Sequence, residues 1–424
     1  MHSTALASTP KDGQKLNSSV NVSDFALSKE IVEAIRDDIT AIESELFDIS
    51  HRIHARPELR FTEHFASELL VEVLRREGFD VETGIAGLAT AFVAAYGSAT
   101  DGPTVAIFLE YDALEEIGHG CGHNVIAALG LGAALAVRRW LGRTDTGPGR
   151  LLVVGSPGEE GGGGKNHLID GGIIDDIDFA MMMHPEGENL AAMATLGRVA
   201  LEFDFEGKAA HAAVSPHLGL NALDATVLTL NAIGLLRQQL PTDARVHTIV
   251  TNGGQATNVI PEHSTIRAYI RAEDTEYLVD QLQPRIENCA RGAALATGTT
   301  VTITTQSPTY AALAPNPVLA DLIEDGFTMV GRRSEPTRTH AFPGSTDMGN
   351  VSQIVPSIHP CIELVPGLGM HTRAAAEVAV GPEGDAAIVD GAFILAGAAI
   401  RLFRSPDLAH AVTQSFTPGI RVGV

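Results

Sequence analysis

The first half of the chain alternates helical apolar spacing with short, continuously apolar runs. Helical spacing extends from about residue 29 to residue 78, with a break at Pro57. A largely apolar helix is expected over residues 125–141. Alternating strands and helices of this kind indicate an α/β fold with a mainly parallel sheet covered on both faces. The short apolar runs predict buried strands over residues 104–111, 151–155 and 179–183.

The pattern changes near Leu196, where the strands become half-exposed. From there the elements follow the order β-α-β-β-α-β, which is the arrangement of a ferredoxin-like domain. We place this domain at residues 197–310, inserted into a larger domain. That larger domain then comprises residues 26–196 and 311–424, and the polar segment 1–25 is expected to be a disordered tail.

Charge and cysteine content exclude several kinds of partner. Of 424 residues, 29 are Lys or Arg and 52 are Asp or Glu, so the formal net charge is -23. We therefore expect no binding to nucleic acid or to anionic membranes, since both need clustered positive charge. Three cysteines do not form a disulfide framework, which favours a cytoplasmic location. The first residues lack the apolar core of a signal peptide, and no uninterrupted apolar run reaches transmembrane length.

Potential metal ligands follow each of the three predicted strands. Ligands of open parallel sheets collect outside the carboxyl ends of the strands. If the three strands are adjacent and parallel, these side chains converge on one crevice. They are Asp112, Cys121 and His123 after the first strand, Glu159 and Glu160 after the second, and His184 after the third.

The segment "GHGCGHN" holds Cys121 and His123 among three glycines. Thiolate, imidazole and carboxylate together suit zinc or a similar divalent ion, and glycines let the loop turn tightly. His371, in the glycine loop "GLGMHTRAA", is a further candidate. Of two adjacent glutamates, one can bind metal while the other removes a proton from a metal-bound water. This combination is the machinery for hydrolysing an amide.

The glycine-rich segment "GEEGGGGKN" also invites comparison with a phosphate-binding loop. That motif requires glycine at Glu159 and Ser or Thr at Asn166. Two glutamates would also repel phosphate. Nucleotide binding is therefore not expected.

Six segments together resemble the M20 metallopeptidase and amidohydrolase family. The subgroup with Cys-Gly-His in the metal loop is most similar, near the aminobenzoyl-glutamate hydrolase subunit and the M20-domain dipeptidases. The resemblance covers about residues 30–405, in the family's order. It is carried by "LEYDALEEIGHGCGHN", "GSPGEEGGGGK", "GKAAHAA", "TNVIPE", "GSTDMGNVS" and "GMHTRAA".

The resemblance implies a role for each matching residue. Two divalent ions are implied, zinc first, with manganese, cobalt or nickel also compatible. It further implies that the inserted domain closes over the site and forms a homodimer. His211 would then act either in the site of its own subunit or in that of the partner. The implied metal ligands are Cys121, His123, Glu160, His184 and His371; the catalytic residues are Glu159 as general base, Asp112 as the group that orients a ligand, and His211 as the oxyanion stabiliser; the substrate-binding residues are Asn258, Arg271 and Thr346.

We therefore expect metal-dependent hydrolysis of an N-acyl amino acid, an aminobenzoyl-glutamate-like compound or a dipeptide. Two other classes stay open. One is a non-catalytic ligand-binding or partner subunit with the same fold, which a metal analysis and an amide-hydrolysis screen would identify. The other is an iron oxygenase that uses two histidines and a carboxylate, which oxygen consumption with Fe(II) would reveal.

One position departs from the family pattern. Many relatives in the broader Cys-containing subgroup have Asp directly after the histidine of the Cys-Gly-His segment. In this chain that histidine is His123, and Asn124 follows it. The difference favours the dipeptidase-like branch and removes a carboxylate from that position.

Overall fold

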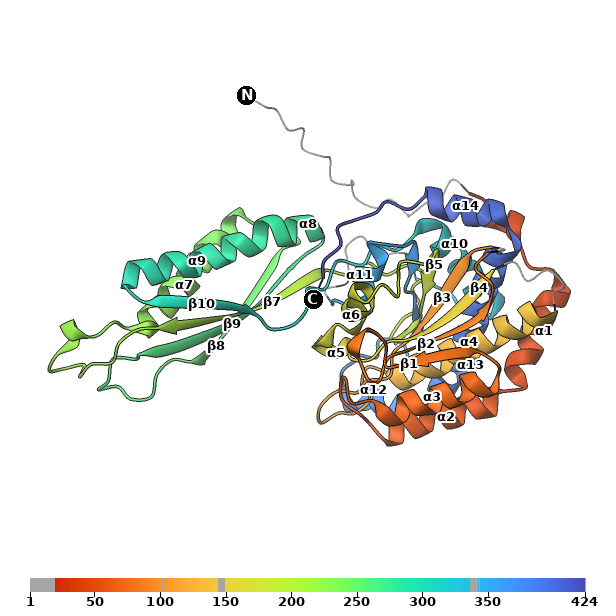
Figure 1. Cartoon of the computed structure of the whole chain (residues 1–424), viewed down its shortest axis with the longest axis horizontal. Coiled ribbons are helices and arrows are strands. Elements are labelled where there is room, and N and C mark those ends of the chain that lie inside the picture. Colours follow the sequence, from red (N-terminus) through yellow and green to blue (C-terminus); the bar gives the residue numbers. More distant parts are fainter. Residues whose placement is uncertain (1–19, 101, 144–148, 336–341, 343, 424) are drawn as a thin grey trace, which may run out of the picture.

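The computed structural model describes residues 20–100, 102–143, 149–335, 342 and 344–423. Residues 1–19 of the predicted tail lie outside the described residues. The described chain forms two bodies joined by crossing segments, as Figure 1 shows. We call residues 197–310 the small unit and the rest of the described chain the large unit. Within the predicted tail, Val22–Phe25 form a one-turn 3₁₀ helix (η1) against the core of the large unit, so order begins before residue 26.

The large unit is built on a six-stranded sheet with the order β1-β2-β4-β3-β5-β11. Four neighbouring strands, β4, β3, β5 and β11, are mutually parallel, while β2 runs antiparallel to both of its neighbours. The sheet is therefore mainly parallel, in agreement with the α/β prediction. Its strands are β1 (Asp80–Thr83), β2 (Phe92–Gly97), β3 (Thr104–Leu109), β4 (Arg150–Gly155), β5 (Phe179–Met181) and β11 (Ser357–Ile358).

Both faces of this sheet are covered, which explains why its central strand is continuously apolar. Every residue of β3 is buried. Because side chains alternate along a strand, Ile107 and Ala106 enter different cores, one on each face. The larger core lies under α1 (Lys29–Thr40), α2 (Glu43–Ala55), α3 (His64–Arg76), α4 (His123–Arg143), α10 (Pro317–Met329), α13 (Pro382–Arg404) and α14 (Pro406–Gln414); the smaller lies under α6 (Gly164–Asp170) and α11 (Met348–Ser352).

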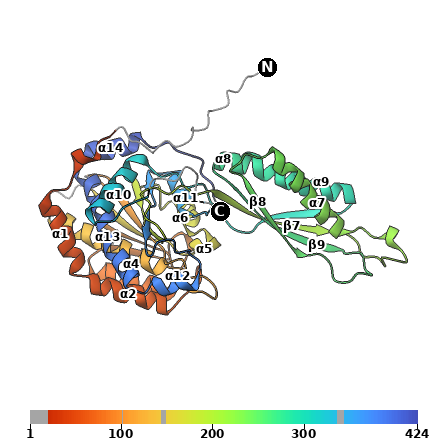
Figure 2. The ribbon, with the colours of Figure 1, turned by 180° about the vertical axis from the view of Figure 1, so that it is seen from behind.

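The two longest helices are core helices. Helices α4 and α13 pack along each other on one side of the sheet, as Figure 2 shows from behind. Both are long and apolar enough to cross a membrane, but 83% of the apolar window of each is buried inside the protein. Their hydropathy is therefore explained by packing.

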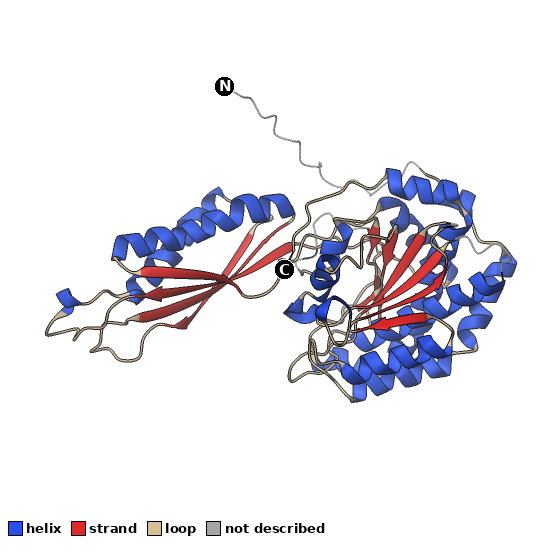
Figure 3. Cartoon of the chain, viewed as in Figure 1, coloured by secondary structure: helices blue, strands red, loops and turns tan. Residues whose placement is uncertain are grey.

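The small unit contains a four-stranded antiparallel sheet in the order β10-β7-β9-β8. Figure 3 shows this sheet with helices on one side and the other face open. The apolar side chains of β7 and β9 pack against helices α7 and α9 in a separate core. The elements are β7 (Gly197–Glu206), α7 (Ala222–Leu236), β8 (Arg245–Asn252), β9 (His263–Ala272), α8 (Thr275–Tyr277), a π-helical turn (Leu278–Leu282), α9 (Gln283–Thr297) and β10 (Thr300–Thr305).

Three sequence-based predictions of elements were wrong in detail. The first helical stretch has an extra break, because Ala41 and Ile42 separate α1 from α2. The predicted strand over 104–111 ends at Leu109. The strand over 179–183 ends at Met181, and His184 begins a new strand that belongs to another sheet. That second sheet pairs β6 (His184–Glu186) with β12 (Cys361–Glu363) in parallel.

Candidate metal centre

The predicted metal ligands follow neighbouring strands of the large sheet. Strand β3 lies between β4 and β5 and is parallel to both. The carboxyl ends of these three strands therefore meet at one edge, which confirms the prediction that the strands are adjacent and parallel. Helix α4 begins at this edge with His123, and the short helix α5 (Glu159–Gly162) begins there after β4.

Glycines shape the loop that carries Cys121 and His123. Gly122 has a φ of +73°, a left-handed conformation that side chains rarely adopt. A Cβ at Gly122 would lie 2.5 Å from Cγ of Pro185. The loop can therefore approach β6 only because this residue is glycine, and that approach brings Cys121 to His184. The distance from Cys121 Sγ to His184 Nε2 is 3.5 Å.

Asp112 is fully buried and fixes two neighbouring groups. Its Oδ1 lies 3.0 Å from Nδ1 of His123, and its Oδ2 accepts a hydrogen bond of 2.9 Å from the backbone N–H of Glu160. Burial raises the pKa of Asp112, but attraction to and hydrogen bonding with His123 outweigh it and leave the pKa below its usual value. The carboxylate therefore orients the ring so that Nε2 points away from it, toward the other donors.

The two glutamates diverge because the backbone around them is irregular. Gly158 and Gly161 have φ values of +71° and +81°, and Glu160 leaves the helical region at ψ 71°. Burial, followed by repulsion from Glu110 and Glu160, raises the pKa of Glu159 well above its usual value. Glu159 is thus suited to exchange a proton, which a general base requires.

His371 reaches the cluster from the loop before α12 (Arg373–Val378). Its φ of 62° is left-handed, a strained conformation for a residue with a side chain. The backbone N–H of His371 donates to the carbonyl of Gly120 over 2.8 Å, which ties this loop to the cysteine loop. Nε2 of His371 lies 3.2 Å from Sγ of Cys121 and 3.2 Å from Oε1 of Glu160.

The donors form two overlapping groups around one thiol. Ligand atoms of Cys121, His123 and His184 lie within 4.8 Å of one another, and so do those of Cys121, Glu160 and His371. Nε2 of His123 is buried and has no hydrogen-bond partner among the described residues. A sulfur shared by a pair of imidazoles on one side and an imidazole with a carboxylate on the other fits two borderline divalent ions.

A buried ion triad that the sequence did not reveal lies directly behind this cluster. The ammonium of Lys165 on α6 contacts carboxylate oxygens of Glu110 and of Asp347, the latter at 2.6 Å, and all three side chains are buried. Attraction to Asp347 and Glu110 overcomes the effect of burial and raises the pKa of Lys165. Each residue lies within a motif that carries the family resemblance, in "LEYDALEEIGHGCGHN", "GSPGEEGGGGK" and "GSTDMGNVS". The available signal for the triad was one charged residue in each of three motifs that were expected to surround the site.

The donors open into a cavity of about 1180 Å³ between the two units. Two of the predicted substrate-binding residues, Arg271 and Thr346, line it. Arg271 donates a hydrogen bond of 2.6 Å to Oγ of Ser345. Arg198, also in the wall, stacks on the ring of Tyr310 with 4.2 Å between its guanidinium carbon and the ring centroid. The cavity thus combines metal-type donors with cationic groups that suit a carboxylate.

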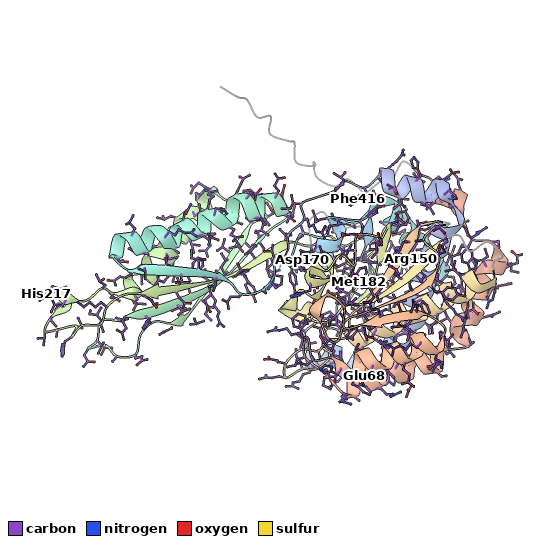
Figure 4. The ribbon with its side chains drawn as sticks, in the orientation of Figure 1. Glu68, Arg150, Asp170, Met182, His217 and Phe416 are labelled. Carbon is purple, nitrogen blue, oxygen red and sulfur yellow. The ribbon has the colours of Figure 1, made fainter. Side chains whose placement is uncertain are left out.

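The structure does not bring His211 and Asn258 into this cavity. Both side chains are exposed, and neither lines it. The backbone N–H of Ala212 donates to the carbonyl of Asn258, so the two residues share one part of the small unit. His217, six residues after His211, lies at the outer end of this unit in Figure 4, away from Met182, which follows β5 of the large sheet.

Asn124 does not face the donor cluster. Its Nδ2 donates to Oγ of Ser50 at 2.9 Å and to the carbonyl of Ala379 at 3.1 Å. The side chain therefore links α4 to α2 and to the end of α12. At the position where this chain departs from the family pattern, the side chain of Asn124 therefore makes a buried structural contact.

Comparison with known proteins agrees with this arrangement. Residues 101–401 match the profile described as Peptidase family M20/M25/M40. The Xaa-Arg dipeptidase of Mus musculus is 36% identical over 379 residues, which cover 87% of this chain and 88% of that protein. One of the p-aminobenzoyl-glutamate hydrolase subunits of Escherichia coli (strain K12) is 37% identical over 292 residues, 64% of this chain and 60% of that protein.

A solved structure shows the same fold. The protein is a dinuclear metal-binding peptidase of the M20 family from Bacillus subtilis, and it superposes with a TM-score of 0.62. The match covers 85% of this chain and 99% of that chain at 17% sequence identity. At this identity the likeness concerns the fold.

We expect Lys165→Met to destabilise the protein strongly. The substitution leaves Glu110 and Asp347 buried without a cation, and breaking a buried pair in this way costs about 3–5 kcal/mol. Urea denaturation followed by circular dichroism measures the change in the free energy of unfolding. Lys29→Met is the matched control, because Lys29 forms an exposed pair with Glu33 and should change that free energy by less than about 0.5 kcal/mol. Equal effects of the two substitutions would contradict this interpretation.

Proposed function

The chain belongs to peptidase family M20/M25/M40, and on that premise we propose how its donor cluster hydrolyses an amide bond. The observation that carries the proposal is the pair of donor groups that share Cys121, with Glu159 beside them. Cys121, His123 and His184 would hold one metal ion, and Cys121, Glu160 and His371 a second. Zinc suits these ligands best, and manganese, cobalt or nickel also fit.

The protein's own residues would supply the proton transfers. Bound divalent ions would polarise the amide carbonyl and acidify a water molecule. Glu159 removes a proton from the attacking water and delivers it to the leaving amine. Asp112 holds the ring of His123 in the required tautomer and orientation. The burial of Glu159 beside the other carboxylates, which raises its pKa, supports this assignment, since a raised pKa favours a carboxylate that accepts and then returns a proton.

The cavity favours small substrates with a free carboxylate. Arg271 would bind that carboxylate, with Ser345 holding its guanidinium in place and Thr346 lining the same wall. N-acyl amino acids, aminobenzoyl-glutamate-like compounds and dipeptides all satisfy this requirement. The names of the mouse and Escherichia coli relatives, an Xaa-Arg dipeptidase and a p-aminobenzoyl-glutamate hydrolase subunit, support the same substrate classes.

We further propose that the small unit is a ferredoxin-like lid and the surface of a homodimer. Its element order and antiparallel sheet support the first part. Strand β8 is an edge strand with Ile249 exposed, and α7 exposes Leu235, so an apolar surface is available for a second copy. His211 and Asn258, which lie outside the cavity of their own chain, would then act in the partner's site.

Removal of metal should abolish amide hydrolysis. Dialysis against a chelator should leave a folded protein without activity, and addition of Zn²⁺ or Mn²⁺ should restore the activity as the metal content rises to about two ions per chain. Inductively coupled plasma mass spectrometry and a hydrolysis screen over dipeptides and N-acyl amino acids measure both quantities. Full activity in metal-free protein would refute the proposal.

Two substitutions separate the base from the ligands. Glu159→Gln should lower kcat by about 10²–10⁴-fold with metal content nearly unchanged, because it removes the proton acceptor alone. Cys121→Ser should lower metal content, because it removes the donor shared by both groups. If Glu159→Gln lost its metal, or if Cys121→Ser kept two ions per chain, the roles assigned here would be wrong.

Mixing two inactive variants tests whether His211 acts across the dimer. Subunit exchange between His211→Ala and Glu159→Gln produces mixed dimers with one complete site if the histidine comes from the partner subunit. A one-to-one mixture should then regain up to about a quarter of the wild-type activity. If the mixture stays inactive after exchange has been verified by mass spectrometry, His211 does not act in the partner's site.

A further inference from the structure

A third histidine lines the cavity besides His184 and His371, and neither the roles proposed above nor the family resemblance gives it a function. His359 lies between β11 and β12, in the segment "SIHPCIELV". It lines the cavity, yet its residue surface is 1% exposed. Neither Nδ1 nor Nε2 has a hydrogen-bond partner among the described residues. A buried imidazole with both nitrogens unpaired is costly, and such groups are kept where a ligand satisfies them.

The backbone holds His359 firmly beside the metal centre. The N–H of Met182 donates to the carbonyl of Ile358, and the N–H of His184 donates to the carbonyl of Pro360 at 2.9 Å. These bonds flank His359 on both sides and align it with the strand that leads into His184. The two imidazole rings meet edge to face, with 5.7 Å between their centroids. The side chain is therefore rigidly placed before any ligand arrives.

The position of His359 argues against a role as a metal ligand. It belongs to neither of the two groups of donor atoms around Cys121. Nε2 of its neighbour His184 faces that thiol, while Nδ1 of His184 is used by the carbonyl of Pro185 at 2.7 Å. His359 thus lies behind the first layer of donors and beside His184, and it still forms part of the cavity wall.

Several other hydrogen-bond donors among the described residues are already engaged or lie outside the cavity. The ammonium of Lys165 is held by Glu110 and Asp347. The guanidinium of Arg60 donates to the carbonyl of Glu160 at 2.9 Å. His211, to which the family resemblance gives the oxyanion, does not line the cavity of its own chain.

We propose that His359 is a further catalytic residue, whose ring N–H hydrogen-bonds the oxygen that becomes negative when the amide is attacked. This role rests on the proposed amide hydrolysis and adds to it a donor from the same chain. Imidazole carries a ring N–H in either neutral tautomer, so one nitrogen of His359 can donate to the oxyanion.

Three variants test the proposal. His359→Leu removes the donor and keeps an apolar group of similar volume, while His359→Gln keeps an N–H donor. Cys361→Ala is the matched control, because Cys361 is buried in the same segment and does not line the cavity. The readouts are kcat and KM for dipeptide hydrolysis, metal content, and the affinity of the metal-loaded protein for a phosphinate analogue of Ala-Arg, which mimics the tetrahedral oxyanion.

We expect His359→Leu to lower kcat by about 100-fold or more, as loss of one oxyanion donor does, with KM and metal content nearly unchanged. The affinity for the phosphinate should fall by a similar factor, and His359→Gln should recover part of both losses. Cys361→Ala should match the wild type. In the wild type, binding of the phosphinate should shift the ¹⁵N resonance of one His359 ring nitrogen.

Two results would overturn the proposal. One is phosphinate affinity in His359→Leu within about threefold of the wild type, since a lost oxyanion donor costs far more. The other is loss of metal from His359→Leu, which would make His359 a ligand. If the wild type itself hydrolysed no amide, the proposed function would fail, and the phosphinate affinities alone would still decide whether His359 binds an oxyanion.

Discussion

The arrangement of the site depends on the close contact of two loops and strand β6 around the buried thiol of Cys121. Gly122 lets the cysteine loop approach Pro185, and that approach places Sγ 3.5 Å from His184. The strained backbone of His371 brings a second imidazole to the same sulfur. Burial raises the pKa of the Cys121 thiol, so its thiolate form needs a cation to be stable. On the proposed ligand set, folding and metal binding are therefore coupled at this sulfur atom.

Behind this thiol, buried charges organise the elements that carry the donors. Asp112 connects the end of β3 to His123 and to the backbone of Glu160. Lys165 connects α6 to Glu110, two residues before Asp112, and to Asp347, next to Thr346. Most of these links join segments distant in sequence, and all lie near the edge of one sheet. This network explains why a metal centre can be built on irregular, glycine-rich backbone without losing its geometry.

Much of this arrangement could be predicted because the determining patterns are local. A continuous apolar run predicts a strand buried on both faces, and donors that follow parallel strands meet at their carboxyl ends. The sequence could not show that His184 begins a separate strand, because pairing with Cys361 depends on a segment far along the chain. For the same reason it missed Lys165, whose partners come from two other elements. The assignments of His211 and Asn258 depend on a second subunit and stay predictions.

Anomalous X-ray diffraction from zinc-loaded crystals tests the central claim most directly. The account predicts two peaks per chain, both at ligand distance from Sγ of Cys121, about 2.3 Å for zinc and sulfur. One peak should also contact His123 and His184, and the other Glu160 and His371. A single peak per chain, or two peaks with Cys121 bound to neither, would contradict the account.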